Sequence, residues 1–391
     1  MNIVHLALQA PYNEGWGYQE NLLTKYQVKL GHQVTLITTN VENRPGGTFE
    51  TVEPCDYMSD DGFRVIRLDH VHKHPRKIFE IYKYFKISQL LESINPDFIM
   101  VHGLGNFSVL QVIKYLKKNP ECTVIADNHL DYNIGAGMLR KKLTTVIYRK
   151  TLRWLNKKMQ KHYKVVYGVT PWRCEYANDI FGINKQKLDV LPAGADDEKI
   201  DFENRERIRS EIREKHNIPQ DSFLVVTGGK IDKKKNIHLL MQAVSEMERD
   251  DVRLIVFGDP AQDIKAEFDK CVQSEKICHI GWIPADDTYN YFLAADLVFF
   301  PGQHSVMWEQ TVACGTPCVF KHYHGMHHCD IGGNCRFLYE DSAEAIRTLL
   351  EEIIEPDNYN AMYKVARSPD SGKFLYSSLA EKSIEAYGRG V

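Results

Sequence analysis

The sequence lacks the features typical of a secreted or membrane-spanning protein. It has no Cys-x-x-Cys pair, and its nine cysteines are an odd number, which fits reduced thiols better than a disulfide framework. No signal-peptide pattern precedes the first strand-like segment, and no apolar run reaches the roughly 18 residues that a membrane span needs. We therefore expect a cytoplasmic protein.

The sequence also lacks any Asp-x-Asp pair, a carboxylate arrangement that would hold a divalent ion against a diphosphate. We expect no metal and no cofactor, with lysines in place of the ion. The net charge of −3 hides an asymmetry, because residues 1–195 carry +8 and residues 196–391 carry −11. The first half is the one expected to face an anionic surface.

Short Val/Ile/Leu-rich runs alternate with segments of helical period in both halves of the chain. They lie at 5–9, 33–39, 98–103, 123–127 and 164–170, and again at 223–228, 251–259, 277–281, 296–300 and 317–320. Continuous apolar strands that alternate with helices indicate parallel sheets covered on both faces. The pattern predicts an α/β fold of two Rossmann-like doubly wound domains, 1–196 and 197–375, facing a central cleft.

A lysine-rich loop, GGKIDKKKN at 228–236, directly follows the apolar run FLVVT at 223–227. A strand end, a glycine turn at Gly229 and clustered ammonium groups suit the diphosphate of a nucleotide. We expect Lys230 and Lys235 to bind this diphosphate and to stabilise its charge as the bond to a sugar breaks. The alternative is a basic loop that faces only water.

The segment 301–315 runs from a strand through a polar loop into a short helix. Ser305 offers a hydroxyl, and Glu309 and Gln310 offer groups that can accept the hydroxyl protons of a ribose. The other interpretation is a capped helix, with Ser305 as the N-cap and Glu309 in the first turn. Both interpretations can hold together.

Gly15 and Gly17 follow the first predicted strand and precede a helix. Such a turn lets backbone approach a phosphate of the donor, although an ordinary strand-to-helix turn explains the pair equally well. Tyr18, beside this turn, is expected on the acceptor side.

Polar side chains end two later strands of the first half. His102 ends the strand at 98–103, and Asp127, Asn128 and His129 end the strand at 123–127. A histidine at such an edge can bind a sugar hydroxyl or move a proton, or it can be structural. We expect His129 to be catalytic and the other three residues to bind the acceptor.

Two further segments are open to more than one interpretation. HYHGMHHCD at 322–330 contains several possible metal ligands, but their spacing matches no closed zinc pattern, so we expect a loop that binds the donor through backbone near Gly325 and Met326. Residues 138–164 hold ten Lys/Arg and no acid, and 72–91 adds a second basic and aromatic stretch. These stretches indicate either a rim on an anionic membrane or packed helices with a solvated side.

Taken in order, these segments resemble glycosyltransferase family 4, the glycosyl transferases group 1, whose members are retaining enzymes of the GT-B fold. The resemblance runs almost end to end through GWGYQENLL, PDFIMVHG, TVIADNH, VLPAGADD, GGKIDKKKN, FGDP and ACGTPCVF. It implies that Lys230 and Lys235 grip the donor diphosphate, Lys230 replacing the family's usual arginine, and that His129 lies near the sugars. It also implies that a helix in 376–391 crosses back to the first domain.

The chain departs from the family at its paired glutamates, which normally bind donor sugar and ribose. Gln310 takes the place of the second glutamate. The first has no counterpart, because the loop from Pro301 is shorter and Gly302 falls where it would be, while Glu309 sits one position off.

The resemblance implies a retaining, metal-independent, hexosyltransferase-type enzyme. It would move a sugar from a nucleotide-sugar to a glycan or lipid-linked acceptor in cell-surface polysaccharide or glycoconjugate synthesis, with no nucleic acid as partner. Two alternatives stay open. One is a nucleotide-sugar epimerase of GT-B fold, and the other is a non-catalytic nucleotide-sugar-binding protein, as the missing glutamate suggests.

Overall fold

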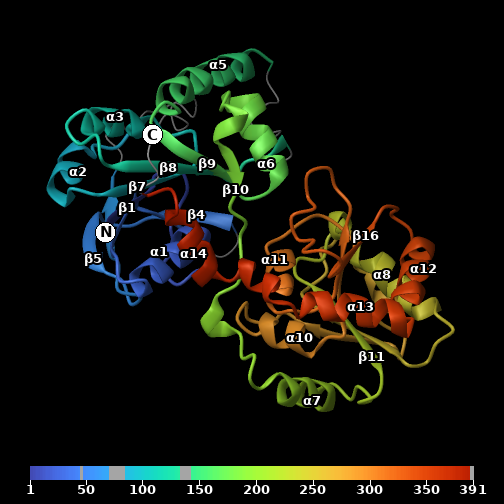
Figure 1. The fold of residues 1–391 in the computed structure, drawn as a ribbon. Helices are drawn as coiled ribbons and strands as arrows, with labels where there is room; N and C mark the ends of the chain where they lie inside the picture. Colours follow the sequence, from blue (N-terminus) through green and yellow to red (C-terminus); the bar gives the residue numbers. More distant parts are fainter. Residues whose placement is uncertain (45–46, 70–83, 133–141, 388–391) are drawn as a thin grey trace. The chain divides into compact units, whose positions relative to one another are not determined.

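Two separate sheets of mainly parallel strands carry the fold (Figure 1). The computed structural model describes residues 1–44, 47–69, 84–132 and 142–387. The chain divides into unit 1, Met1–Pro192 with Tyr376–Val391, and unit 2, Ala193–Leu375. Each sheet is covered by helices, so the prediction of two Rossmann-like α/β domains is confirmed.

The sheet of unit 1 has the order β10-β9-β8-β7-β1-β2-β6-β5. Neighbouring strands pair in parallel except β5 and β6, and β3 and β4 form a separate antiparallel hairpin. The strands are β1 Asn2–Ala7, β2 Gln33–Thr39, β3 Val41–Arg44, β4 Thr48–Thr51, β5 Cys55–Met58, β6 Arg64–Leu68, β7 Phe98–His102, β8 Thr123–Asn128, β9 Tyr163–Gly168 and β10 Leu188–Val190. The strand order reverses between β1 and β7, and this is where open α/β sheets bind ligands.

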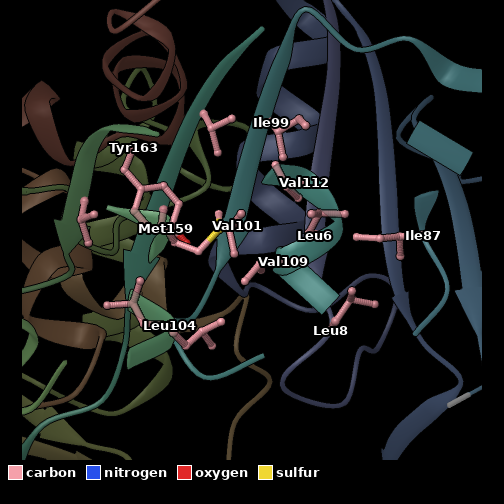
Figure 2. Close-up of a cluster of buried hydrophobic side chains, with 14 of the residues drawn as sticks. Leu6, Leu8, Ile87, Ile99, Val101, Leu104, Val109, Val112, Met159 and Tyr163 are labelled. Atoms are coloured by element: carbon pink, nitrogen blue, oxygen red, sulfur yellow. The ribbon is translucent and has the colours of Figure 1, made fainter. Parts of the chain in front are cut away.

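Helices cover this sheet because its central strands are apolar on both faces. In β1, Val4 and Leu6 belong to one buried cluster and Ile3 and Ala7 to the other. Figure 2 shows the first cluster, where Leu6, Ile99 and Val101 from the strands meet side chains from the covering segments. The helices are α1 Gln19–Lys29, α2 Ser88–Ile94, α3 Leu110–Leu116, α5 Lys142–Met159 and α6 Pro171–Tyr176.

The C-terminal helix α14, Tyr376–Ile384, belongs to unit 1 and packs beside α1 (Figure 1). Its buried Tyr376, Leu379 and Ala380 join the core cluster that contains Leu23 of α1. Apolar residues at positions i, i+3 and i+4 form one face of a helix, so a single stripe of α14 is buried.

The sheet of unit 2 has the order β13-β12-β11-β14-β15-β16, and all its pairs are parallel. The strands are β11 Phe223–Gly228, β12 Val252–Phe257, β13 Ile277–Gly281, β14 Leu297–Phe300, β15 Cys318–Lys321 and β16 Cys335–Leu338. The helices are α7 Arg205–Lys215, α8 Ile237–Glu246, α9 Lys265–Cys271, α10 Thr288–Ala294, α11 Met307–Ala313, α12 Ala343–Ile354 and α13 Pro356–Ala366. Here the strand order reverses between β11 and β14.

The carboxyl ends of β11 and β14 therefore form the switch point of unit 2. The lysine-rich loop 228–236 follows β11, and the polar segment that starts at Pro301 follows β14. Two motifs about seventy residues apart in the sequence meet at this edge because β11 and β14 are neighbours in the sheet.

A substitution at Gly258, which directly follows β12, would show how tightly this edge of unit 2 is packed. Its φ is +106°, and an added Cβ would overlap the carbonyl oxygen of Gly229. Gly281 has φ +68°, but an added Cβ there meets nothing within 4 Å. Gly281→Ala should cost about 1–2 kcal/mol from the left-handed backbone alone, whereas Gly258→Ala should cost about 3 kcal/mol or more because overlap adds to it.

The measurement is the free energy of unfolding of each variant in urea. Equal losses in the two variants would show that the contact between Gly258 and Gly229 does not limit the packing of this edge.

Candidate functional site

Lys235 ties together the two loops at the switch point of unit 2. Its Nζ donates to the carbonyl oxygen of Gln303 at 2.6 Å and to that of His304 at 3.3 Å. The backbone N–H of Gln303 donates back to the Lys234 carbonyl at 2.9 Å, and Asn236 Nδ2 donates to the Pro301 carbonyl at 3.3 Å. The loop after β11 and the loop after β14 thus form one hydrogen-bonded unit.

The charge of Lys235 is held in a largely desolvated position. Burial lowers the pKa of Lys235 to about 8, Asp232 partly opposes this shift, and Lys230 adds to it. Lys230 itself is 76% exposed, with Nζ 3.4 Å from Asp232 Oδ2. One lysine is therefore fixed at the switch point, and the other is exposed to solvent beside Asp232.

Gly302 explains why the first glutamate of the family pattern is missing. A Cβ at this position would overlap the Lys234 carbonyl oxygen and the backbone of Lys235. The shortened loop lies directly against the lysine loop, so no side chain fits where the resemblance would put a glutamate.

Glu309 lies in α11 and has no exposed surface. Its Oε1 is 2.9 Å from His304 Nε2 and 2.8 Å from His328 Nε2. Burial raises the pKa of Glu309, but the two histidines outweigh burial and lower it to about 2. Glu309 therefore offers no exposed atom for the expected contact with a ribose. Its carboxylate instead binds His304 and His328 inside unit 2.

The other predicted donor residues of this segment lie nearer the surface. Gln310 is half-buried and its Nε2 donates to the hydroxyl of Tyr289 at 3.2 Å. Ser305 is also half-buried, but it is not the helix cap, because the N-cap of α11 is Val306 and the Ser305 carbonyl accepts from Trp308 N at 3.0 Å. The interpretation of Ser305 as a cap was wrong.

The loop after β15 contains two more of the predicted donor residues of unit 2. Gly325 and Met326 are buried, and the Met326 N–H donates to the Tyr323 carbonyl at 3.2 Å. Gly229, at the end of β11, likewise donates its N–H to Phe257 O at 3.0 Å. The two N–H groups of Met326 and Gly229 are thus used within unit 2, and donor contacts through these residues stay predictions.

In unit 1, the predicted polar cluster is centred on the buried carboxylate of Asp127 at the end of β8. Asp127 Oδ2 accepts from His102 Nδ1 at 2.6 Å and lies 3.4 Å from His129 Nε2, while Oδ1 accepts from Gly103 N at 2.9 Å. Burial raises the pKa of Asp127, but the two histidines hold it well below its usual range. Of the two histidines, only His129 is well exposed, at 43% of its side chain.

A buried hydrogen-bond chain continues from His102 to the C-terminal helix. Burial lowers the pKa of His102, but Asp127 outweighs burial and raises it, whereas burial and His102 lower the pKa of His5 to about 3. His5 is therefore neutral, so its Nδ1 accepts from His102 Nε2 at 2.9 Å and its Nε2 donates to Gln27 Oε1 at 2.7 Å. Gln27 Nε2 then donates to Ser383 Oγ at 3.0 Å.

This chain gives Asp127 and His102 a structural task within unit 1. Asn128 is also buried, and its Nδ2 donates to the carbonyls of Leu130 and Arg173, each at 2.9 Å. The expectation that these three residues bind an acceptor stays a prediction. Sequence reasoning did not find His5 as the partner of His102, although a histidine inside an apolar strand is an unusual signal.

The glycine turn of unit 1 is open to solvent. Gly15, Gly17 and Tyr18 precede α1, and apart from the adjacent residues no atom lies within 4 Å of where a Cβ would stand on either glycine. Trp16 and Tyr18 are both exposed, with their ring centroids 5.2 Å apart. The turn is therefore exposed to solvent, and its contact with a phosphate of the donor stays a prediction.

Helix α5 covers residues 142–159 of the basic stretch 138–164 and has two different faces, while residues 138–141 of that stretch lie outside the described part of the chain. Leu152, Leu155 and Met159 are buried in the core, whereas Val146, Ile147 and Trp154 are exposed. Among the described helices, none combines the length and the low polarity needed to span a bilayer. Of the second basic stretch, 72–91, residues 72–83 lie outside the described part of the chain.

Comparison with known proteins gives two family matches that together cover most of the chain. Residues 21–199 match the model described as Glycosyltransferase Family 4, and residues 208–368 match Glycosyl transferases group 1. The chain is 23% identical to D-inositol 3-phosphate glycosyltransferase 1 of Catenulispora acidiphila over 233 residues, 54% of each protein. It thus spans about half the length of the curated relatives it matches.

Solved structures show the same fold over nearly the whole chain. A glycosyltransferase from Rickettsia africae aligns with a TM-score of 0.67 at 15% identity, covering 98% of this chain and 97% of its own. Anabaena HepE in complex with UDP aligns with a TM-score of 0.66 at 13% identity, covering 98% and 99%. The fold is therefore GT-B, as the resemblance implied.

The variants Asp127→Asn and His129→Gln should show which of the two side chains stabilises unit 1. Asp127→Asn leaves a buried histidine without its carboxylate and should lower the free energy of unfolding by about 3 kcal/mol. His129→Gln changes an exposed side chain and should stay within about 0.5 kcal/mol of the parent. Urea unfolding of both variants measures this, and an unchanged Asp127→Asn would show that the buried chain does not stabilise the unit.

Proposed function

Because the chain belongs to glycosyltransferase family 4, we propose that it is a retaining glycosyltransferase that moves a sugar from a nucleotide-sugar to a glycan or lipid-linked acceptor. We further propose a role in cell-surface polysaccharide or glycoconjugate synthesis. The observation that carries the proposal is Lys235, a partly desolvated cation held at the switch point of a Rossmann-like sheet. The solved relative HepE carries UDP, which supports a nucleotide-linked donor.

Lys235 is suited to bind one phosphate oxygen. An ammonium group has three N–H donors, and two of them are directed to the carbonyls of Gln303 and His304. The third remains for a diphosphate, whose charge Lys235 stabilises more strongly than an exposed lysine would because water is largely excluded. Lys230, which is exposed, can close on the same diphosphate from solvent.

The proposed reaction needs no metal at the diphosphate. The two lysines neutralise the charge that develops as the sugar–phosphate bond breaks, and the acceptor hydroxyl attacks from the same face of the sugar. His129 orients the sugar or the acceptor through its exposed ring, while Asp127 positions that ring. Gln310 offers its carboxamide oxygen to the ribose, with Ser305 beside it.

Lys235→Ala should lower turnover by at least about 100-fold, since removal of one preorganised charge-stabilising donor typically costs that much. The measurement is transfer or slow donor hydrolysis with a panel of nucleotide-sugars. Lys234→Ala is the matched control, because Lys234 is exposed on the same short turn and should keep near-parental turnover. Normal turnover in Lys235→Ala would overturn the assignment.

The pH profile gives a second signature of the same residue. With a pKa of about 8, Lys235 is charged below that pH and neutral above it, so donor use should fall as pH rises through 8. At pH 9 about a tenth of Lys235 remains charged, so kcat/KM should fall about tenfold. Lys235→Arg, which cannot lose its charge in this range, should remove this alkaline decline even if its activity is low.

A nucleotide-sugar epimerase of the GT-B fold is the rival enzyme, since it would use the same donor without an acceptor. Incubation of the protein with donor alone separates the two functions. A new nucleotide-sugar or free epimerised sugar without acceptor would favour the epimerase, whereas acceptor-dependent release of nucleoside diphosphate supports transfer.

We also propose that unit 1 binds an anionic membrane surface through α5. Val146, Ile147 and Trp154 expose apolar surface, and Lys158 Nζ lies 4.3 Å from the centre of the Trp154 ring. Trp154→Ser should reduce co-sedimentation with anionic vesicles several-fold and leave unfolding unchanged, because the ring is half exposed. Equal sedimentation with neutral and anionic vesicles would contradict the proposal.

A further inference from the structure

Three side chains with atoms that could ligate a metal converge inside unit 2, from segments that lie apart in the sequence. His304 comes from the loop after β14, Glu309 from α11, and His328 from the loop after β15. Their ligand atoms all lie within 4.8 Å of one another. The side chains of His304, Glu309 and His328 are 12%, 0% and 6% exposed.

Hydrogen bonding alone leaves polar atoms of this cluster without partners. Both imidazoles approach the same carboxylate oxygen, Oε1 of Glu309, at 2.9 and 2.8 Å. Within the described part of the chain, the buried Oε2 of Glu309 and Nδ1 of His328 have no hydrogen-bond partner. Buried polar atoms are normally paired, so orphaned ones call for an unseen water or ion.

The cluster of His102, Asp127 and His129 in unit 1 differs in how its buried polar atoms are paired. Asp127 also lies between two histidines, but both of its oxygens are engaged, one of them by the backbone N–H of Gly103. His102 uses both ring nitrogens, through Asp127 and His5. That cluster is satisfied by the protein, whereas the cluster around Glu309 is not.

The distances around Glu309 are close to those of a metal centre. Zn²⁺ holds nitrogen and oxygen ligands at about 2.0–2.2 Å, which puts tetrahedral ligands about 3.4 Å from one another. The two histidine nitrogens stand 2.8–2.9 Å from Oε1, so an ion would need each ligand to move outward by only about half an ångström. A thiol lies beside them, since Cys329 Sγ is 3.6 Å from His328 Nε2.

We propose that His304, Glu309 and His328 bind a divalent transition-metal ion of the Zn²⁺ class. Two imidazoles and one carboxylate suit Zn²⁺ and its first-row neighbours, whereas Mg²⁺ and Ca²⁺ prefer all-oxygen sites. The ion is structural: it joins the loop after β14 to the loop after β15. The proposed sugar transfer needs no metal at the diphosphate. The ion proposed here holds protein loops together and does not act on the diphosphate.

The position of the ion connects it to Lys235. His304 supplies a ligand through its ring and accepts a hydrogen bond from Lys235 through its carbonyl. An ion that fixes His304 therefore fixes one of the two carbonyls that hold the Lys235 ammonium.

The test is metal binding by the full chain, read without any substrate. After treatment with a chelator, the protein should bind one equivalent of Zn²⁺ in equilibrium dialysis, and Co²⁺ should give the strong visible absorption of a four-coordinate site. Bound Zn²⁺ should raise the thermal unfolding midpoint, and Mg²⁺ at the same concentration should not.

Variants locate the ion. Glu309→Gln keeps the size of the side chain and should weaken Zn²⁺ binding at least 100-fold, and His328→Gln should do the same. His327→Gln is the matched control, because His327 is an exposed neighbour and should leave binding unchanged. His129→Gln should also bind one equivalent, which excludes the cluster of unit 1.

Two results would overturn the inference. One is the absence of saturable Zn²⁺ binding by the folded parent chain, which stands even if a variant fails to fold. The other is equal binding by the parent and by folded Glu309→Gln, which would put the ion elsewhere.

Discussion

The hydrogen bonds from the Lys235 ammonium to the carbonyls of Gln303 and His304 are the interaction on which the candidate site of unit 2 depends. They join the loops after β11 and β14 where the strand order of the sheet reverses. A lysine in such a place loses most of its water, and the two carbonyl dipoles replace part of it. Its position is therefore set by backbone atoms of a second loop and not by its own flexible chain.

The same region of unit 2 also contains a buried anion, which is stabilised by side chains and not by backbone carbonyls. Glu309 is stabilised by two side chains, His304 and His328, each from a different loop. The loop after β14 thus contacts a buried cation through its backbone and a buried anion through a side chain. Movement of His304 would disturb both charges, so the loops of this edge should respond together to a ligand.

Most of the fold could be predicted from the sequence because the central strands of both sheets are continuous apolar runs. The strands that it did not predict include β5, β10 and β16, which lie at sheet edges and bury only part of their surface. Local pattern also predicted that the lysine loop and the segment after Pro301 would occupy strand ends. It could not predict that Glu309 is buried, because one of the two histidines that compensate its charge, His328, lies nineteen positions later in the sequence.

Gly302 restricts how the donor specificity of this chain could be redesigned. A Cβ added to Gly302 would overlap the Lys234 carbonyl oxygen and lie 2.5 Å from the Lys235 Cα, so a side chain fits there only if the backbone moves. A point substitution that restores the family's acidic residue would push the two loops apart and release the ammonium between them. Loop grafting, in which the longer segment of a homologue replaces the stretch between Pro301 and Val306, is the route that preserves the geometry while adding the carboxylate.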